Sequence, residues 1–290
     1  MNTTAPRRPK SRLFLVGCPR SGTTLLQSML AAHPDIISFP ESHFFKLISF
    51  EKPAMESVFK KINIISRRGR GKFRGFVHSI GKQADLNRHI HTYCPFRDQY
   101  VKAFINILDE LAAEKGKSFW LEKTPGHLRH IDYIETVAEN AKFIHIIRRG
   151  ENAVASMYEA TNKYPKLWGG SFTVDECIDW WNESIRISFD NCKKPNHTFV
   201  SYESLLKEPR DILTDLCKFL EIDWDEAMLT HRQSVSDNLI LGREPWKQSV
   251  KGPLRQDTSE KFLRLFDEAQ REHIRSRLSP IEVLPAVELR

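Results

Sequence analysis

The sequence predicts an α/β fold in which helices cover both faces of a parallel β-sheet. Short apolar runs alternate with helical segments along the 290 residues, an order that is typical of βαβ units. The chain shows no internal repeat, and its length suits one large domain. The predicted strands are residues 13–17, 118–121, 142–147 and 198–201.

The first predicted strand is Leu13-Phe14-Leu15-Val16-Gly17. Its continuous apolar run is expected of a strand that is buried on both faces. A helix is predicted over residues 23–32, with its apolar side chains on one face. It ends at His33, because a helix rarely continues through the residue before a proline.

The next segment, residues 44–117, is predicted to be a largely helical insertion after the first strand–helix unit, on the side where a substrate would bind. Residues 1–11 are polar and basic and predict a flexible tail, so residues 12–290 form the expected domain. The later helices are predicted over residues 127–140, 151–161, 174–191 and 259–278.

The chain is basic, with a formal charge of +7 and a pI near 9.1. This charge favours an anionic partner, such as a nucleotide, a sulfated or phosphorylated acceptor, nucleic acid or an anionic membrane. Basic residues gather in the N-terminal tail and in residues 60–74. Residues 60–74 form either a solvated face or a binding surface for an acidic acceptor.

Five cysteines without a C-x-x-C pair argue against a disulfide framework or a zinc site. They favour a reducing compartment, and no metal is expected. The apolar run Leu13–Val16 is too short to span a bilayer and does not resemble a signal peptide. We therefore expect a cytoplasmic protein without a membrane span.

A phosphate-binding loop is predicted directly after the first strand. Gly17 and Gly22 enclose four residues, as in a P-loop, but Thr23-Thr24 replaces the lysine–hydroxyl pair that follows the second glycine. A basic residue, Arg20, stands inside the loop instead. Backbone N–H groups and the helix dipole make such a turn an anion site. The loop therefore predicts a P-loop-like fold that grips one phosphate.

The segment Cys18-Pro19-Arg20-Ser21-Gly22-Thr23-Thr24 resembles the 5′-phosphosulfate loop of sulfotransferases that use 3′-phosphoadenosine 5′-phosphosulfate (PAPS). Its Pro-Arg-Ser-Gly-Thr-Thr-Leu form is similar to the bacterial and tyrosylprotein branch of that family. The resemblance implies PAPS as co-substrate and the bisphosphate PAP as product. The residues that it assigns to the phosphosulfate are Arg20, Ser21, Gly22, Thr23 and Thr24.

A second anion site is predicted after the strand that ends at Ile147. Arg148 and Ser156, eight residues apart, resemble the 3′-phosphate motif of the same family, and an arginine fork with a hydroxyl suits a phosphate. Tyr202 resembles the tyrosine that approaches the adenine, although it could simply cap a strand end. Lys251 resembles a basic residue placed against the 3′-phosphate, or is a solvated lysine.

Sulfuryl transfer resembles phosphoryl transfer, so catalysis needs positioning, cations and a base for the acceptor hydroxyl. Arg20, in the phosphate-binding loop, and Lys123 are the expected cations. Lys123 follows a strand at the sheet edge where ligands bind. The resemblance assigns the base to Glu41. His127 and then His43 are the alternatives.

The predicted function is therefore transfer of a sulfuryl group from PAPS to an acceptor hydroxyl on a small molecule, sugar, lipid or peptide tyrosine. One alternative is a P-loop kinase or NTPase, which would need a lysine after Gly22 and a magnesium-binding aspartate. Another is a basic, non-enzymatic module for nucleic acid or anionic membrane, which would leave the two phosphate motifs unexplained. We expect no nucleic-acid partner, and the oligomeric state stays open.

Overall fold

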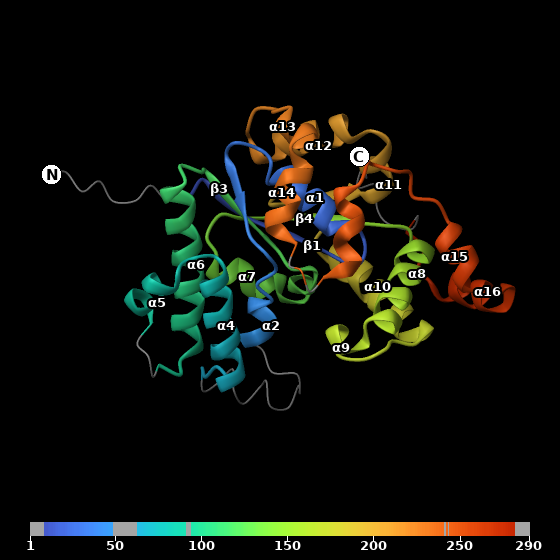
Figure 1. Cartoon of the computed structure of the whole chain (residues 1–290), viewed down its shortest axis with the longest axis horizontal. Coiled ribbons are helices and arrows are strands. Elements are labelled where there is room, and N and C mark those ends of the chain that lie inside the picture. The colour runs from blue at the N-terminus through green and yellow to red at the C-terminus, as the bar shows by residue number, and fades with distance from the viewer. Residues whose placement is uncertain (1–8, 49–62, 91–93, 241, 243, 282–290) are drawn as a thin grey trace. The chain divides into compact units, whose positions relative to one another are not determined.

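The computed structural model describes residues 9–48, 63–90, 94–240, 242 and 244–281 (Figure 1). The chain divides into two compact units. The first consists of Met1–Phe14 and Asp35–Lys142, and the second of Leu15–Pro34 and Phe143–Arg290.

A five-stranded sheet has the strand order β2-β3-β1-β4-β5. In β2–β3 and β4–β5 the strands run parallel, with Ile36 opposite Phe119 and Ile147 opposite Ser201. The predicted parallel sheet flanked by helices is thus confirmed. The strands are β1 (Ser11–Gly17), β2 (Ile36–Ser38), β3 (Phe119–Lys123), β4 (Ala141–Ile147) and β5 (His197–Ser201).

The first unit holds the largely helical segment that the sequence predicts. Its aromatic core joins α4 and α6, where Phe73 and Phe76 pack against Phe104, and the two helices lie side by side in Figure 1. The ring of Phe44 in α2 stacks on Phe104 at 4.2 Å. The helices are α2 (Phe44–Ile48), α4 (Arg67–Ser79), α5 (Gln83–His89), α6 (Arg97–Glu114), the 3₁₀ helix η1 (Pro125–His130) and α7 (Ile131–Val137).

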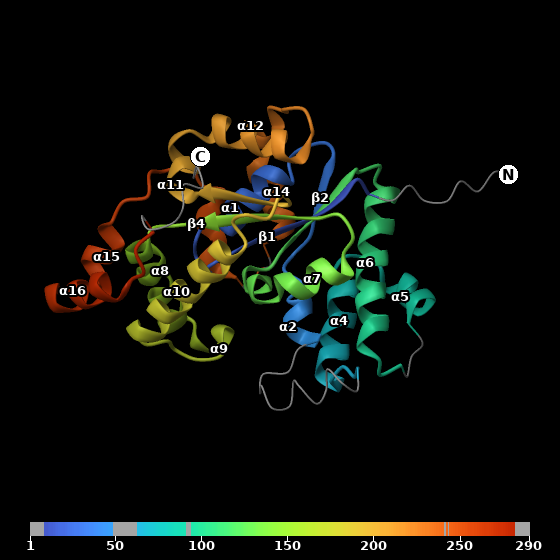
Figure 2. The same cartoon turned by 180° about the vertical axis from the view of Figure 1, so that it is seen from behind.

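The second unit packs α8 against both α10 and α15 (Figure 2). Their shared core includes Val154 of α8, Trp181 of α10 and Phe262 of α15, all essentially inaccessible to solvent. The helices are α1 (Thr23–Leu30), α8 (Gly150–Lys163), α9 (Pro165–Trp168), α10 (Val174–Asp190), α11 (Tyr202–Lys207), α12 (Pro209–Leu220), α13 (Ala227–Thr230), α14 (Arg232–Leu239), η2 (Pro245–Lys251), α15 (Glu260–Leu265) and α16 (Glu268–Arg277).

Several predicted boundaries differ from the observed ones. The short strand β2 was not predicted, and the helix expected over residues 259–278 is two helices, α15 and α16. The helix expected over residues 127–140 is η1 followed by α7. Most of the predicted tail, residues 1–8, lies outside the described residues, and the single-domain organisation stays a prediction.

The basic stretch falls largely on α4. Arg67, Arg68 and Lys72 are exposed there, whereas Arg74 is partly buried. Lys60 and Lys61, which open the stretch in the sequence, lie outside the described residues.

Within the described ranges, no helix is both long and apolar enough to cross a membrane.

Candidate functional site

Between the last residue of β1 and the N-cap of α1, three residues have positive φ. Gly17 and Gly22 have φ angles of 152° and 89°, and Arg20 has 72°. A Cβ on Gly17 would lie 2.5 Å from the carbonyl oxygen of Ile146, and one on Gly22 would lie 2.1 Å from the ring of Tyr202. Both positions therefore require glycine, because a side chain would meet a strained backbone and occupied space.

The start of α1 suits an anion. The first turn contains no acidic residue, and the helix dipole places partial positive charge at this end. Thr23 and Thr24 are buried, and the Ser21 hydroxyl is buried without a hydrogen-bond partner among the described residues. A buried hydroxyl without a partner is unfavourable, so this one is available to an oxygen of a bound phosphate.

Arg20 joins this loop to α8 and η2. Its Nε donates to the Ser156 hydroxyl at 3.3 Å, and its Nη2 donates to the carbonyl of Trp246 at 3.0 Å. Arg148 donates from Nη1 to the carbonyl oxygen of Arg20 at 2.8 Å. The structure thus brings Arg20, Arg148 and Ser156 together, although they come from different parts of the sequence.

Tyr202 lies between the loop and Arg148. Its ring is the group that Gly22 approaches closely, and the Arg148 guanidinium lies 4.8 Å from the ring centroid, within the range of a cation–π interaction. Burial raises the pKa of the Tyr202 phenol, and Arg148 only partly opposes this change. Tyr202 is therefore neutral near pH 7 and acts here through its ring.

Arg148 also forms a bidentate ion pair with Asp257, which follows η2 in the sequence. The Arg148 Nε lies 2.7 Å from Asp257 Oδ2, and Nη2 donates to Oδ1. The side-chain amide of Asn152 donates to Oδ2 at 2.9 Å. The fork of Arg148 that would suit a phosphate thus holds a carboxylate.

Lys251 has a different ion partner. It ends η2, and its ammonium lies 2.5 Å from Asp237 of α14. The nearby backbone is held by the buried Arg232, which donates to the carbonyls of Val250 at 2.8 Å and Gly252 at 2.7 Å. The role of Lys251 toward a nucleotide stays a prediction.

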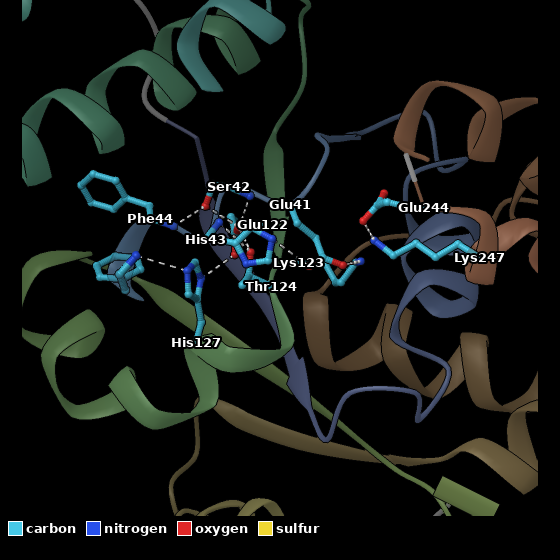
Figure 3. Close-up of polar contacts among 11 residues, drawn as sticks. Glu41, Ser42, His43, Phe44, Glu122, Lys123, Thr124, His127, Glu244 and Lys247 are labelled. Carbon is cyan, nitrogen blue, oxygen red and sulfur yellow. Dashed lines mark hydrogen bonds and ion pairs between the residues drawn. The ribbon is translucent and has the colours of Figure 1, made fainter. Parts of the chain in front are cut away.

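In the first unit, Lys123 and Glu41 form an ion pair (Figure 3). Lys123 ends β3, and its side chain is 1% exposed, whereas that of Glu41 is 12% exposed. A buried ammonium needs such a partner, because an unpaired charge in the interior is strongly unfavourable. Glu41 therefore presents a carboxylate that its neighbour holds in place.

Glu122, the residue before Lys123, is the anchor of the loop that carries Glu41. Adjacent strand residues point to opposite faces, and Glu122 is 1% exposed. Its Oε1 accepts hydrogen bonds from the hydroxyls of Ser42 and Thr124, both at 2.7 Å, and from the Ser42 N–H at 3.3 Å. Thr124 Oγ1 accepts in turn from the N–H of His43 at 3.2 Å.

The charge of Glu122 is stabilised within this network. Burial alone would raise the pKa of Glu122, but the neighbouring His127 and the hydrogen bonds from Ser42 and Thr124 outweigh burial and lower its pKa. Glu122 is therefore an anion at neutral pH. Ser42 follows Glu41 and Thr124 follows Lys123 in the sequence, and His127 is itself a candidate base. The network around Glu122 therefore contacts the neighbours of the candidate site residues.

His127 is completely buried. Its Nε2 accepts the N–H of Phe45 at 3.2 Å, and its Nδ1 lies 2.7 Å from Glu122 Oε2. The ring packs edge-on against Phe45. Both nitrogens therefore face internal partners, which favours Glu41 over His127 as the base.

His43 lies nearer to solvent. Its side chain is 53% exposed, and its Nε2 lies 3.5 Å from Glu41 Oε2. Partial desolvation lowers the pKa of His43, which Glu41 only partly offsets. A neutral His43 beside Glu41 could relay a proton, so this alternative also stays open.

The predicted residues thus fall into two groups. The loop, Arg148, Ser156 and Tyr202 belong to the second unit, and Glu41, Lys123 and His127 belong to the first. Sequence reasoning missed the anchoring role of Glu122 and the whole of Asp257. The position of Glu122 in a strand beside Lys123 could have indicated its role. Asp257 belongs to no motif, so nothing in the sequence indicated its ion pair with Arg148.

Across the described residues, no group of three or more His, Cys, Asp or Glu side chains could hold a metal ion.

The sequence model described as the sulfotransferase family matches residues 12–226 of this chain. The chain is 28% identical over 230 residues to protein-tyrosine sulfotransferase 1 of Danio rerio, and 26% identical over 228 residues to protein-tyrosine sulfotransferase 2 of Gallus gallus. Each match covers 77% of this chain, and 56% and 54% of the relative. The chain therefore spans about half the length of these curated relatives.

Among solved structures, the fold is similar to the sulfotransferase domain of the Synechococcus PCC 7002 olefin synthase. The TM-score is 0.57 at 23% sequence identity, over 92% of this chain and 98% of that domain.

Proposed function

The chain belongs to the sulfotransferase family, and on this premise we propose that it transfers a sulfuryl group from PAPS to an acceptor hydroxyl and releases PAP. The observation that carries the proposal is the bonded set of Arg20, Arg148 and Ser156. These contacts connect the phosphate-binding loop after β1 to Arg148, which follows β4. A nucleotide with two separate phosphates requires two such binding sites. The kinase and the non-enzymatic binding module are not favoured, since neither accounts for this pairing.

The second unit supplies the proposed donor site. The N–H groups and hydroxyls of Ser21 to Thr24 hold the 5′-phosphosulfate, while Arg148 and Ser156 hold the 3′-phosphate. Tyr202 offers an aromatic face for the adenine. Arg20, already within reach of Ser156, turns toward the sulfuryl oxygens when the donor binds.

The first unit supplies the proposed activation of the acceptor. The oxygen of the acceptor hydroxyl forms a bond to sulfur while Glu41 accepts the hydroxyl proton. The bond between sulfur and the bridging oxygen breaks, and its electron pair stays on PAP. Lys123 holds Glu41 in position through their ion pair, and offers positive charge for the developing negative charge. Lys123 ends β3 and Glu41 follows β2, and open α/β sheets bind ligands at the carboxyl ends of their strands.

A phenolic hydroxyl is our first candidate acceptor, because the matched relatives are named protein-tyrosine sulfotransferases. A tyrosine in a peptide is the corresponding natural substrate class. The exposed arginines and lysine of α4 would favour an acceptor that carries negative charge.

A cytoplasmic location is also part of the proposal. All five cysteines lie in the described ranges, and none forms a disulfide, which supports a reducing compartment.

The activity is tested with sulfur-labelled PAPS and a panel of a simple phenol, a tyrosine peptide and a sugar. We expect label transfer to at least one hydroxyl, with stoichiometric PAP, and loss of transfer in Glu41→Gln. Hydrolysis of ATP with magnesium, without any transfer from PAPS, would contradict the proposal.

A further inference from the structure

Asp257 occupies the nitrogen pair of Arg148 that would bind a phosphate. The carboxylate accepts from both Nε and Nη2, which is the side-by-side geometry that an arginine fork also makes with two phosphate oxygens. Both side chains are largely buried, at 14% exposure for Arg148 and 8% for Asp257. Carboxylate and phosphate cannot accept the same two N–H groups at once.

The position of Asp257 is supported on two sides. Asn152, which is 4% exposed on α8, donates to Asp257 Oδ2 at 2.9 Å. Five residues earlier, the buried Arg232 holds the carbonyl of Gly252 at 2.7 Å. The segment from Gly252 to Asp257 is therefore fixed at its start by Arg232 and at its end by Arg148 and Asn152.

We propose that Asp257 is a specificity-determining residue that competes with the 3′-phosphate of the donor for Arg148. This inference rests on the proposed function, since it concerns the same nucleotide. A 3′-phosphate carries more charge than a carboxylate and displaces Asp257, whereas a nucleotide without that phosphate leaves the Arg148–Asp257 pair intact. The displacement reduces the affinity for PAP and PAPS but not the affinity for AMP.

The same competition assists product release. When PAP leaves, Asp257 returns to Arg148, so the vacated guanidinium is never left unpaired in a partly buried site. Asp257 thereby lowers the barrier to dissociation of the product, a step that often limits turnover.

The test measures the dissociation constants of PAP and AMP by calorimetry, for the wild type and for Asp257→Asn. We expect PAP to bind about tenfold more tightly to the variant, because one charge-assisted competitor is gone. AMP binding should stay unchanged. Glu260→Gln is the matched control: it removes one negative charge three residues away, on an exposed residue, and should leave both constants at their wild-type values.

A second variant, Asp257→Ala, and the melting temperature of each ligand-free protein check that the fold is intact. Weaker or unchanged PAP binding in both folded variants would overturn the inference, as would an equal gain for PAP and AMP. These outcomes differ from a failure of the proposed function itself, in which the wild type would bind PAP no better than AMP.

Discussion

The guanidinium of Arg20 donates a hydrogen bond to the hydroxyl of Ser156, 136 residues further along the chain. Arg20 adopts a left-handed backbone, with φ at 72°, a conformation that is unfavourable for residues other than glycine. This backbone conformation directs the Arg20 side chain across the loop toward α8, where it contacts Ser156. The two phosphate-binding motifs are therefore one connected set of residues, because Arg148 also donates to the backbone carbonyl of Arg20.

Glu41→Gln should lower kcat by about 10²–10⁴-fold, the usual contribution of a positioned general base. The affinity for PAP should stay nearly constant, since Glu41 is proposed to act on the acceptor. Steady-state kinetics and PAP calorimetry measure the two quantities separately. His43→Gln is the matched comparison. A large loss of kcat in that variant, with full activity in Glu41→Gln, would transfer the role of base to His43.

Gly22→Ala should unfold or strongly destabilise the protein and abolish PAP binding. The new methyl group would lie 2.1 Å from the Tyr202 ring at a φ of 89°, and backbone strain alone costs about 1–3 kcal/mol. Gly71→Ala is the control, because a Cβ there meets no atom within 4 Å. It lies within α4 and should raise stability by about 0.4–1 kcal/mol. Urea unfolding compares the two, and equal effects would refute the packing argument.

Glu122→Gln should destabilise the protein by about 2–4 kcal/mol, because it breaks a buried network of hydrogen bonds. The loop that carries Glu41 would lose its anchor, so kcat should fall while PAP affinity is kept. Glu122 has a lowered pKa, and its contribution to stability is present above about pH 4.3 and is lost as the pH falls through the folded-state pKa. Acid unfolding followed by circular dichroism should therefore show a weaker pH dependence in the variant.

His145 should make the protein less stable as the pH falls below about 6.5. It is fully buried in β4 beside His197, and burial together with that neighbour lowers its pKa well below 6.5. The unfolded chain binds a proton there that the folded protein does not, so stability is lost with falling pH at up to about 1.4 kcal/mol per unit.

Urea unfolding between pH 5 and pH 7.5 measures this slope. His145→Gln should flatten it, whereas His78→Gln, at an exposed position of α4, should leave it unchanged. The same slope in all three proteins would show that His145 titrates as it does in the unfolded chain.

The long, strongly patterned elements of the fold were predictable from the sequence. The strand expected over residues 142–147 is β4 (Ala141–Ile147), and the helix expected over 174–191 is α10 (Val174–Asp190). Burial of β4 in the sheet explains its apolar run, and burial of one face of α10 in the core explains the periodic pattern of that helix. The strand β2 has three residues, too few for a pattern, and its pairing with β3 supplies the stability that its own sequence lacks.

One missed boundary did have a local signal. The helix expected over residues 259–278 breaks because Asp267 and Gln270 form a capping box at the start of α16, and a capping residue followed three positions later by glutamine is a known helix-start pattern. By contrast, the Arg148–Asp257 ion pair joins residues 109 positions apart. Only the folded chain brings them together, so the motif at Arg148 could be predicted but its internal partner could not.

The most direct test of the central claim compares PAP and AMP binding by calorimetry in the wild type and in Arg148→Gln. If the loop and the strand end bind the two phosphates of one nucleotide, the wild type prefers PAP by at least about tenfold, and Arg148→Gln loses that preference while it keeps its affinity for AMP. A wild type that binds the two nucleotides equally well, or an Arg148→Gln variant that still prefers PAP, would contradict the account.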